Sequence, residues 1–474
     1  MPIHSSVLVR FVGILTTLLF WVTNNTVSAQ VADSTLVIGT VKLTGHEKTK
    51  DYIVLRELDF KSGDTLLASK LAAMKVKGIR QIFDLELFNS VEMQIAPPDS
   101  LGLTHITIYL KERWYLFVLP IVEIADRNFN QWGLADNKLS RLNYGVRIRR
   151  SNLRGRNETI RINIQAGYTR KFSVDYNFPY INKALTIGAA LNFTYSDNRE
   201  LGFATQNNKL QFFHDTGKIS FRRLKTGVTF SLRKKIYSSQ LIDLEYTQLQ
   251  IADTVAKAGV NPDYFLNGET RQQTFYAGYR YIYEMLDYKH YPLNGKYLSA
   301  EAGNYFFINS PRNLFNAFIT ASYHKKLTGR HYASFSIDAK YSSPGRQPYN
   351  LYKALGYGYF VRGFEYYVID GQHFALGKIN YLYNILTPKS IHIPTGGIKK
   401  FRNIPITIFA KAFYDAGYVT DNNPLPTNTF ANSYLGGIGA GIDIVTYYDR
   451  VFKVEYTFNN KGQKGLFFHY NMLF

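Results

Sequence analysis

The sequence has 474 residues and a formal net charge of +21, from 56 Lys and Arg against 35 Asp and Glu. It has no cysteine, which excludes a disulfide scaffold, a thiolate zinc site and thiol catalysis. Hydrophobic residues make up 46% of the chain, too many for long disorder. After the N-terminus no apolar run reaches the roughly 18 residues of a membrane helix. The 37 Tyr and 34 Phe are typical of an all-β protein, including a membrane β-barrel.

The N-terminus has the parts of a secretion signal. Arg10 supplies positive charge, residues 11–22 form an apolar core too short to cross a bilayer, and residues 27–29 place small side chains before a cleavage site. We predict that residues 1–29 are a signal peptide and that the mature chain starts at Gln30. A retained interfacial anchor is the alternative. No cysteine follows the apolar core, which excludes a lipoprotein anchor.

Residues 30–113 are predicted to form a small α/β domain with the element order β-α-α-β-β. A segment of about 80 residues is long enough to bury a small core of its own. Thr65 is expected to cap the second helix, which follows a break at residues 61–64. The strands are expected at 36–43, 88–95 and 104–110, and the helices at 49–58 and 65–83.

From Trp114 onward the hydrophobic pattern has a period of two. Residues 160–166, for example, alternate apolar side chains with Arg161, Asn163 and Gln165. This alternation fits a soluble sandwich, which buries its apolar face, and also a membrane barrel, which turns that face toward lipid. Three features favour the barrel: the secretion signal, the charged residues at lumen positions, and strands of about 10 to 12 residues.

We therefore predict that residues 114–474 form a 16-stranded transmembrane antiparallel β-barrel. With an even number of strands, the chain enters and leaves the barrel on the same side of the membrane. Short turns alternate with long loops at 198–217, 253–269, 344–371 and 419–433, and the long connector at 387–403 is an exception on the turn side. The strands are expected near 114–126, 143–153, 158–169, 172–181, 185–197, 218–234, 240–252, 270–285, 296–307, 313–326, 331–343, 372–386, 404–418, 434–446, 450–459 and 465–474.

The alternation also assigns side chains to the two faces of the barrel. Pro120 lies in the first strand and donates no ladder hydrogen bond, so it belongs at an edge or at a bulge in a closed barrel. The residues expected to face lipid are Ile160, Ile162, Ile164, Ile438, Ile442, Phe452 and Val454. The residues expected to face the lumen are Arg161, Lys411, Lys453 and Glu455.

Two short motifs and the C-terminus carry a family resemblance. The long loop after the eleventh strand contains Val361, Arg362, Gly363 and Phe364, and the thirteenth strand contains Phe413, Asp415 and Gly417 in the pattern F-x-D-x-G. Tyr470, Met472 and Phe474 end the chain in the manner of an outer-membrane barrel signal. With the small N-terminal domain, the sequence resembles the BamA/TamA family of outer-membrane assembly factors over nearly the whole mature chain.

The resemblance implies a single POTRA domain followed by the barrel. It also implies that Arg362 in the loop pairs with Asp415 on the inner wall. The parity of the strand supports this pairing, because Lys411, Asp415 and Gly417 share one face. The loop at 344–371 is expected to fold back into the lumen. The chain departs from the family in having one POTRA domain and in placing His469 where the final strand prefers glycine.

No enzymatic motif is present in the sequence. His46 and Glu47 begin a metalloprotease pattern, but Lys50 occupies the position of the second histidine. Gly437, Gly439 and Gly441 are interpreted as a stripe that lets a packed loop approach the wall, rather than as a phosphate loop. We predict no catalytic residue, no cofactor and no metal.

Two functions from different classes fit these observations. In the first, the protein inserts or translocates unfolded polypeptides: the POTRA domain captures chains by strand addition, and the seam between the first and last strands acts as a gate. In the second, it is a passive pore or structural barrel plugged by its loop. The expected location is the outer membrane of a Gram-negative-type bacterium, with the POTRA domain in the periplasm. The expected partners are unfolded outer-membrane or secreted polypeptides, outer-membrane lipids and accessory periplasmic or outer-membrane proteins; despite the positive charge, nucleic acid is not among them.

Overall fold

The computed structural model describes residues 34–134, 137–214, 218–308, 310–392, 403–446 and 450–471. The predicted signal peptide lies outside these residues, as do Met472 and Phe474. The chain divides into two compact units: one is formed by residues up to 46, 58–84 and 88–111, and the other by 47–57, 85–87 and 112 onward. The boundary expected between residues 113 and 114 stays a prediction. Within the described ranges, no helix combines the length and the hydropathy that crossing a membrane requires.

The small domain is built on a four-stranded sheet with the order β2-β1-β4-β3. Its strands and helices are β1 (Thr35–Thr44), β2 (Thr65–Leu67), η1 (Ala68–Lys70), α3 (Leu71–Phe83), β3 (Phe88–Ile95) and β4 (Leu103–Glu112). The helix α2 (Asp51–Leu55) lies between β1 and β2 in the sequence but belongs to the other compact unit. β1 pairs parallel with β4 and antiparallel with β2. The core is formed by one face of the sheet and of α3, because every second residue of β4 is buried along Ile106, Ile108 and Leu110.

Two elements of this domain differ from the prediction. Thr65 does not cap a helix: residues 65–67 form the short strand β2, with Thr65 opposite Val37 of β1. The backbone N–H and C=O groups of residues 65–67 take part in the pairing with β1, so the helix α3 begins only at Leu71, after the 3-10 turn η1. The first helix is also shorter than predicted, ending at Leu55.

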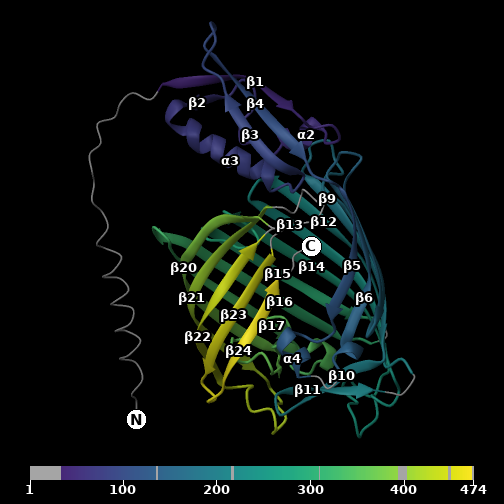
Figure 1. Cartoon of the computed structure of the whole chain (residues 1–474). Helices are drawn as coiled ribbons and strands as arrows, with labels where there is room; N and C mark the ends of the chain where they lie inside the picture. The colour runs from purple at the N-terminus through teal and green to yellow at the C-terminus, as the bar shows by residue number, and fades with distance from the viewer. Residues whose placement is uncertain are drawn as a thin grey trace, which may run out of the picture. The chain divides into compact units, whose positions relative to one another are not determined.

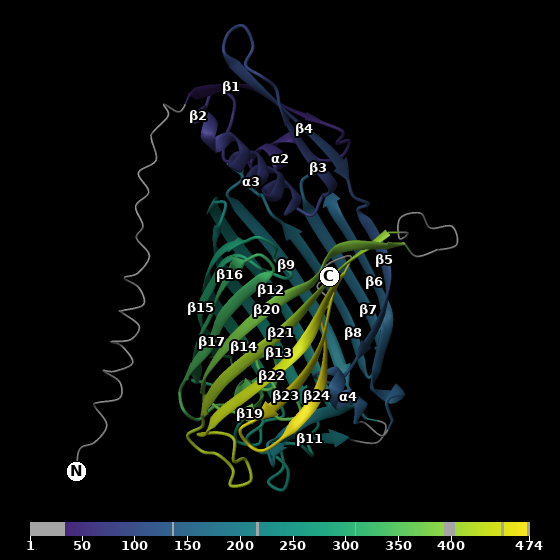
Figure 2. The ribbon, with the colours of Figure 1, turned by 60° about the vertical axis from the view of Figure 1, so that its left-hand side comes forward.

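The large unit contains a single antiparallel sheet of sixteen strands, the number predicted from the sequence. The sheet curls round into a barrel (Figure 1 and Figure 2). Its strands are β5 (Leu116–Ile124), β6 (Leu142–Leu153), β7 (Glu158–Gly167), β8 (Thr169–Phe178), β9 (Ile187–Asn198), β12 (Phe221–Lys235), β13 (Ser238–Ile251), β14 (Arg271–Leu286), β15 (Gly295–Phe307), β16 (Asn313–Thr328), β17 (His331–Ser343), β20 (His373–His392), β21 (Asn403–Thr420), β22 (Tyr434–Thr446), β23 (Arg450–Asn459) and β24 (Lys464–Asn471). Residues 387–392 and residue 403 of the predicted connector belong to β20 and β21, which remain paired as far as His392 opposite Asn403, and the rest of the connector lies outside the described residues.

Short elements lie between the barrel strands. α4 (Phe129–Gly133) and η2 (Leu139–Arg141) follow β5, and η3 (Tyr349–Leu351), β18 (Lys353–Leu355) and β19 (Ile369–Asp370) lie in the loop at 344–371. The predicted loop at 198–217 contains a hairpin of β10 (Glu200–Gln206) and β11 (Lys209–His214). Asn207 and Asn208 turn this hairpin with φ of 52° and 59°, the conformation that two-residue hairpin turns require.

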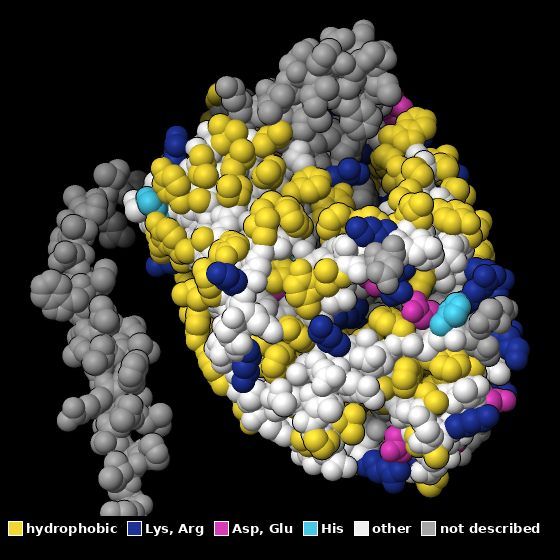
Figure 3. Space-filling view, turned by 60° about the horizontal axis from the view of Figure 1, so that its bottom comes forward, with side chains coloured by type: hydrophobic (Ala, Val, Ile, Leu, Met, Phe, Trp, Pro, Cys, Tyr) yellow, Lys and Arg dark blue, Asp and Glu magenta, His cyan; other side chains and the backbone are white. Residues whose placement is uncertain are grey.

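The two faces of the barrel wall carry different side chains. Ile438, Ile442 and Phe452 are 56%, 45% and 42% exposed, whereas Lys411 and Glu455 on the other face are buried. Ile164 is also exposed, and Ile160, Ile162, Val454, Arg161 and Lys453 are partly exposed. Figure 3 shows hydrophobic side chains crowding the flanks of the barrel. The strand parity is therefore as predicted at four outward positions, Ile164, Ile438, Ile442 and Phe452, and at two inward positions, Lys411 and Glu455, where the burial is clear.

Candidate functional site inside the barrel

The loop at 344–371 folds back against the inner wall of the barrel, as predicted. Its apolar side chains form a buried cluster with side chains from three barrel strands. The cluster includes Leu355, Val361, Phe364 and Ile369 from the loop, and Phe374, Leu376, Val419 and Leu435 from β20, β21 and β22. Burial of this apolar surface fixes the loop in the lumen, so its polar residues meet the wall at defined positions.

Arg362 and Asp415 make the predicted pair. The guanidinium Nε donates to Oδ2 of Asp415 at 2.9 Å, and Nη2 donates to Oδ1. The backbone N–H of Arg362 donates to the same carboxylate at 3.0 Å. The guanidinium carbon lies 3.7 Å from the ring centroid of Phe413. Both charged side chains are buried, so the pair is a fork-to-carboxylate contact in a dry environment and differs from an exposed salt bridge.

Glycines on the wall make this close contact possible. A Cβ atom at Gly437 would lie 1.9 Å from the carbonyl oxygen of Arg362, and one at Gly417 would lie 2.5 Å from Val361 Cγ2. A Cβ at Gly439 would meet the ring of Phe413 at 2.7 Å. The packing interpretation of the glycine stripe is therefore confirmed at Gly437, where the loop backbone touches the wall.

A network of buried charges surrounds the pair. Lys411 bridges Asp443 and Glu455, with Nζ 2.5 Å from an oxygen of each. Arg362 Nη1 lies 3.4 Å from Glu455 Oε1. Buried charges are tolerated when each has opposite charges and hydrogen bonds around it, so removal of one member leaves an uncompensated charge.

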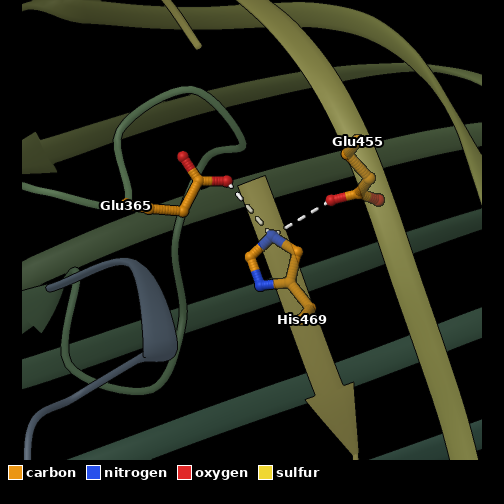
Figure 4. A group of neighbouring side chains, drawn as sticks. All are labelled: Glu365, Glu455 and His469. Atoms are coloured by element: carbon orange, nitrogen blue, oxygen red, sulfur yellow. Dashed lines mark ion pairs between the residues drawn. The ribbon is translucent and has the colours of Figure 1, made fainter. Parts of the chain in front are cut away.

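Two members of the site were missed by the sequence analysis, Glu365 and His469. Glu365 follows the loop motif and accepts a hydrogen bond from the backbone N–H of Gly363 at 2.8 Å. His469 on β24 places Nε2 at 3.4 Å from Glu365 Oε1 and 3.1 Å from Glu455 Oε2 (Figure 4). The sequence analysis noted His469 as a departure from the family in the final strand but did not place it in the site, and in the structure it shares inward parity with the buried Phe467.

The segment after β5 contacts both the loop and the last strand. Arg127, Asn128 and Gln131 donate side-chain hydrogen bonds to loop carbonyls at Tyr367, Glu365 and Tyr366, at 3.0, 2.8 and 2.9 Å. Asn130 in α4 contacts the backbone of Phe468 on β24. Its amide oxygen accepts from the Phe468 N–H at 3.0 Å, and its amide nitrogen donates to the Phe468 carbonyl at 3.3 Å.

β5 and β24 are the two ends of the sheet. Within the described residues they form no strand pairing with each other. Pro120 of β5 lies opposite Val146 of β6, and the pairing of these two strands contains no bulge. Pro120 therefore lies on an edge strand, and the alternative prediction that it marks a bulge in a closed barrel is wrong. Of the predicted C-terminal signal, Tyr470 is described and points outward with 40% exposure.

Comparisons with known proteins agree with this architecture. Residues 36–113 match the POTRA family, described as "Surface antigen variable number repeat". BamA from Haemophilus ducreyi lacking POTRA domains 1–3 has a TM-score of 0.50 at 14% identity, covering 92% of this chain and 84% of its own.

Two further solved structures are also similar. CdiB from Acinetobacter baumannii has a TM-score of 0.52 at 13% identity over 92% of this chain and 73% of its own. CdiB from Escherichia coli has a TM-score of 0.53 at 11% identity over 95% and 92%. No curated protein matches the sequence. Residues 36–113 are therefore a POTRA domain, and the 16-stranded sheet that follows has the fold shared by BamA and CdiB.

Proposed function

We propose that this protein lies in the outer membrane of a Gram-negative-type bacterium and inserts or translocates unfolded polypeptides. It is not an enzyme in this proposal, and its POTRA domain lies in the periplasm. The observation that carries the proposal is the edge of β24, where a side chain, Asn130, satisfies the backbone of Phe468 in place of a neighbouring strand. An edge held by a side chain can be released for another strand.

The POTRA domain supports capture of the client chain. β3 is an end strand of the four-stranded sheet, with Phe88, Val91 and Met93 turned into the core. A polypeptide that pairs with this edge gains backbone hydrogen bonds, which depend little on its sequence. β2 at the other end has only three residues and offers a much shorter edge.

The seam between β5 and β24 supports transfer into the membrane or across it. Pro120 on β5 has no N–H to donate, which weakens any ladder formed along this edge. An incoming strand would replace the amide of Asn130 with its own backbone donor and acceptor. This exchange conserves the hydrogen bonds of Phe468, so the cost of opening is low.

The partners follow from this mechanism. They are unfolded outer-membrane or secreted polypeptides, the surrounding lipids, and accessory periplasmic or outer-membrane proteins. Depletion of the protein, followed by a census of the outer-membrane proteome and of secreted proteins, tests the proposal. We expect a defined set of β-barrel or secreted proteins to be lost. An unchanged census would contradict it.

The second candidate is a passive pore or structural barrel plugged by its loop. It is favoured by the buried contacts that hold the loop to the wall, above all Arg362 with Asp415. Single-channel recording distinguishes the two. The insertion and translocation proposal expects a mostly closed channel with brief openings, whereas a large and steadily open conductance supports the pore.

A further inference from the structure

We propose that Glu365, Glu455 and His469 form a site for a divalent metal ion of the zinc class, which ties the loop to the last strand. The three residues come from the loop, from β23 and from β24 (Figure 4). Each offers one ligand atom, and these atoms lie within 4.8 Å of one another. The proposal does not depend on what the barrel transports.

The distances fit an ion better than a hydrogen-bonded histidine. An ion bound at about 2.0–2.2 Å to nitrogen and oxygen, at tetrahedral to octahedral angles, sets the two atoms about 2.8–3.6 Å apart. Nε2 of His469 lies 3.1 Å from one carboxylate oxygen and 3.4 Å from the other. A single N–H cannot donate well to both, and 3.4 Å exceeds the usual N–H···O length of about 2.7–3.2 Å.

Two of the ligand atoms have no other use. In the part of the chain that the structure describes, Glu365 Oε1 and His469 Nε2 are buried and have no hydrogen-bond partner outside the cluster. Glu365 is 2% exposed, and its other oxygen is taken by the backbone N–H of Gly363. A buried carboxylate oxygen beside a histidine nitrogen is costly unless a positive charge joins them, and this charge is either a bound cation or the protonated imidazole itself.

The neighbouring charges leave room for a cation. Arg362 and Lys411 both approach Oε1 of Glu455, so Oε2 of Glu455 is the atom that faces His469. Among the described residues the charges around the site balance before the histidine is counted. Four carboxylates, Glu365, Glu455, Asp415 and Asp443, face four cations, Arg362, Lys411, Lys378 and Lys453.

The donor set selects the class of metal. Imidazole nitrogen with two carboxylate oxygens suits Zn²⁺ and related transition ions, whereas Ca²⁺ and Mg²⁺ prefer oxygen alone. Phe360 stacks on the His469 ring with centroids 5.4 Å apart, which holds the imidazole in one orientation. A site with three protein ligands leaves a further position for water.

The test uses the full chain purified without a polyhistidine tag, loaded with Zn²⁺ and dialysed. Metal content is measured by mass spectrometry and affinity by competition with a chromogenic chelator. We expect an equimolar amount of Zn²⁺ on the wild type. Glu365→Gln and His469→Gln should weaken affinity by at least about 10- to 100-fold, the loss that even outer-shell substitutions cause. His331→Gln removes an imidazole from β17, away from the cluster, and should leave affinity unchanged.

A second measurement keeps the proposal testable if a variant folds poorly. A chelator should lower the thermal unfolding temperature of the wild type and leave that of His469→Gln unchanged. Zn²⁺ uptake by the wild type that is no greater than that of His469→Gln would overturn the proposal, since His469 would then only bridge the carboxylates as a cation. Equal loss in His331→Gln would overturn it as well.

Discussion

At the scale of single residues, the position of the loop rests on Arg362. Its guanidinium forms a fork with Asp415 and stacks on Phe413, and its third nitrogen faces Glu455. A lysine retains the charge but supplies neither the fork nor the flat surface. Exchange of the two charges would be no clean test of the pair, because Arg362→Asp would place a carboxylate beside Glu455 and Asp415→Arg would place a guanidinium beside Lys378.

Removal of the Arg362 side chain should destabilise the barrel strongly. We expect Arg362→Ala to cost about 3–5 kcal/mol, because Asp415 becomes a buried charge without its main partner. Arg362→Lys should be intermediate. Urea unfolding of refolded protein in lipid vesicles measures the loss. Arg154 is the control, since its pair with Glu158 is 57% exposed on the arginine side and Arg154→Lys should cost about 0–1 kcal/mol. Equal losses at Arg362 and Arg154 would show that the loop pair is unimportant.

Gly437 tests the close approach of the loop to the wall. Gly437→Ala places a methyl group in the space of the Arg362 carbonyl, so the loop must shift. We expect destabilisation of about 1–3 kcal/mol and faster proteolysis in the loop, as overpacking of a tight interior causes. Gly358 lies in the same loop, and a Cβ there meets nothing within 4 Å. Gly358→Ala should behave like the wild type; proteolysis that is equally fast in both variants would refute the contact.

At the scale of elements, the strands follow from the sequence and the short elements do not. All sixteen barrel strands were predicted from the period-two pattern, because each exposes one face and buries the other over many residues. β2 was missed because its three residues are too few for a period. The hairpin β10–β11 was missed although Asn207 and Asn208 are a turn signal.

The candidate site was predicted only in part, for a similar reason. Arg362 and Asp415 were found from their motifs and from strand parity. Glu365 and His469 are separated by more than a hundred positions, so no local pattern connects them. Only the curl of the sheet, which brings β24 to the loop, places them together.

α4 is the element whose role is most readily tested. Asn130→Leu removes both hydrogen bonds to the backbone of Phe468, and the unsatisfied groups should cost about 1–3 kcal/mol. Hydrogen–deuterium exchange at the Phe468 amide should accelerate, and brief channel openings should become more frequent. Asn137→Leu is the matched control, since among the described residues the hydrogen bonds of Asn137 are with Ser140 in its own turn. Unchanged exchange at Phe468 would show that Asn130 does not hold the edge.

At the scale of the whole molecule, the barrel turns apolar side chains outward on all its strands and keeps charges inside. This inversion is expected if the barrel crosses a membrane, because the lipid replaces the core as the apolar environment. Outward residues along β22 illustrate it: Ile438 and Ile442 are exposed, whereas Asp443 is buried. The same alternation would fit the sheet of a soluble protein. The features that favour a membrane barrel over a soluble sheet are the curl of the sheet and its charged interior.

A charge on the outer face tests membrane crossing. Ile442→Arg near the middle of β22 should cost about 2–4 kcal/mol when the protein is folded in lipid vesicles. Leu425 is equally exposed but lies in the loop after β21, so Leu425→Arg should cost little. Chemical unfolding in vesicles gives both values. A cost near zero for Ile442→Arg would mean that this face does not meet lipid.

The seam is the centre of the functional account, and a disulfide lock tests it directly. Because the chain has no cysteine of its own, a pair of introduced cysteines, one in Leu116–Ile124 of β5 and one in Lys464–Asn471 of β24, can form a disulfide without competing thiols. The control pair is Ile442→Cys with Val454→Cys, which are opposite each other on β22 and β23, where no opening is proposed.

The decisive measurement is the outer-membrane and secreted proteome of cells that carry only the locked protein. With the seam oxidised, we expect the same client proteins to disappear as after depletion, while the barrel itself stays folded. Reduction should restore them, and the control pair should have no effect in either state. A complete set of client proteins in cells with an oxidised seam would contradict the account.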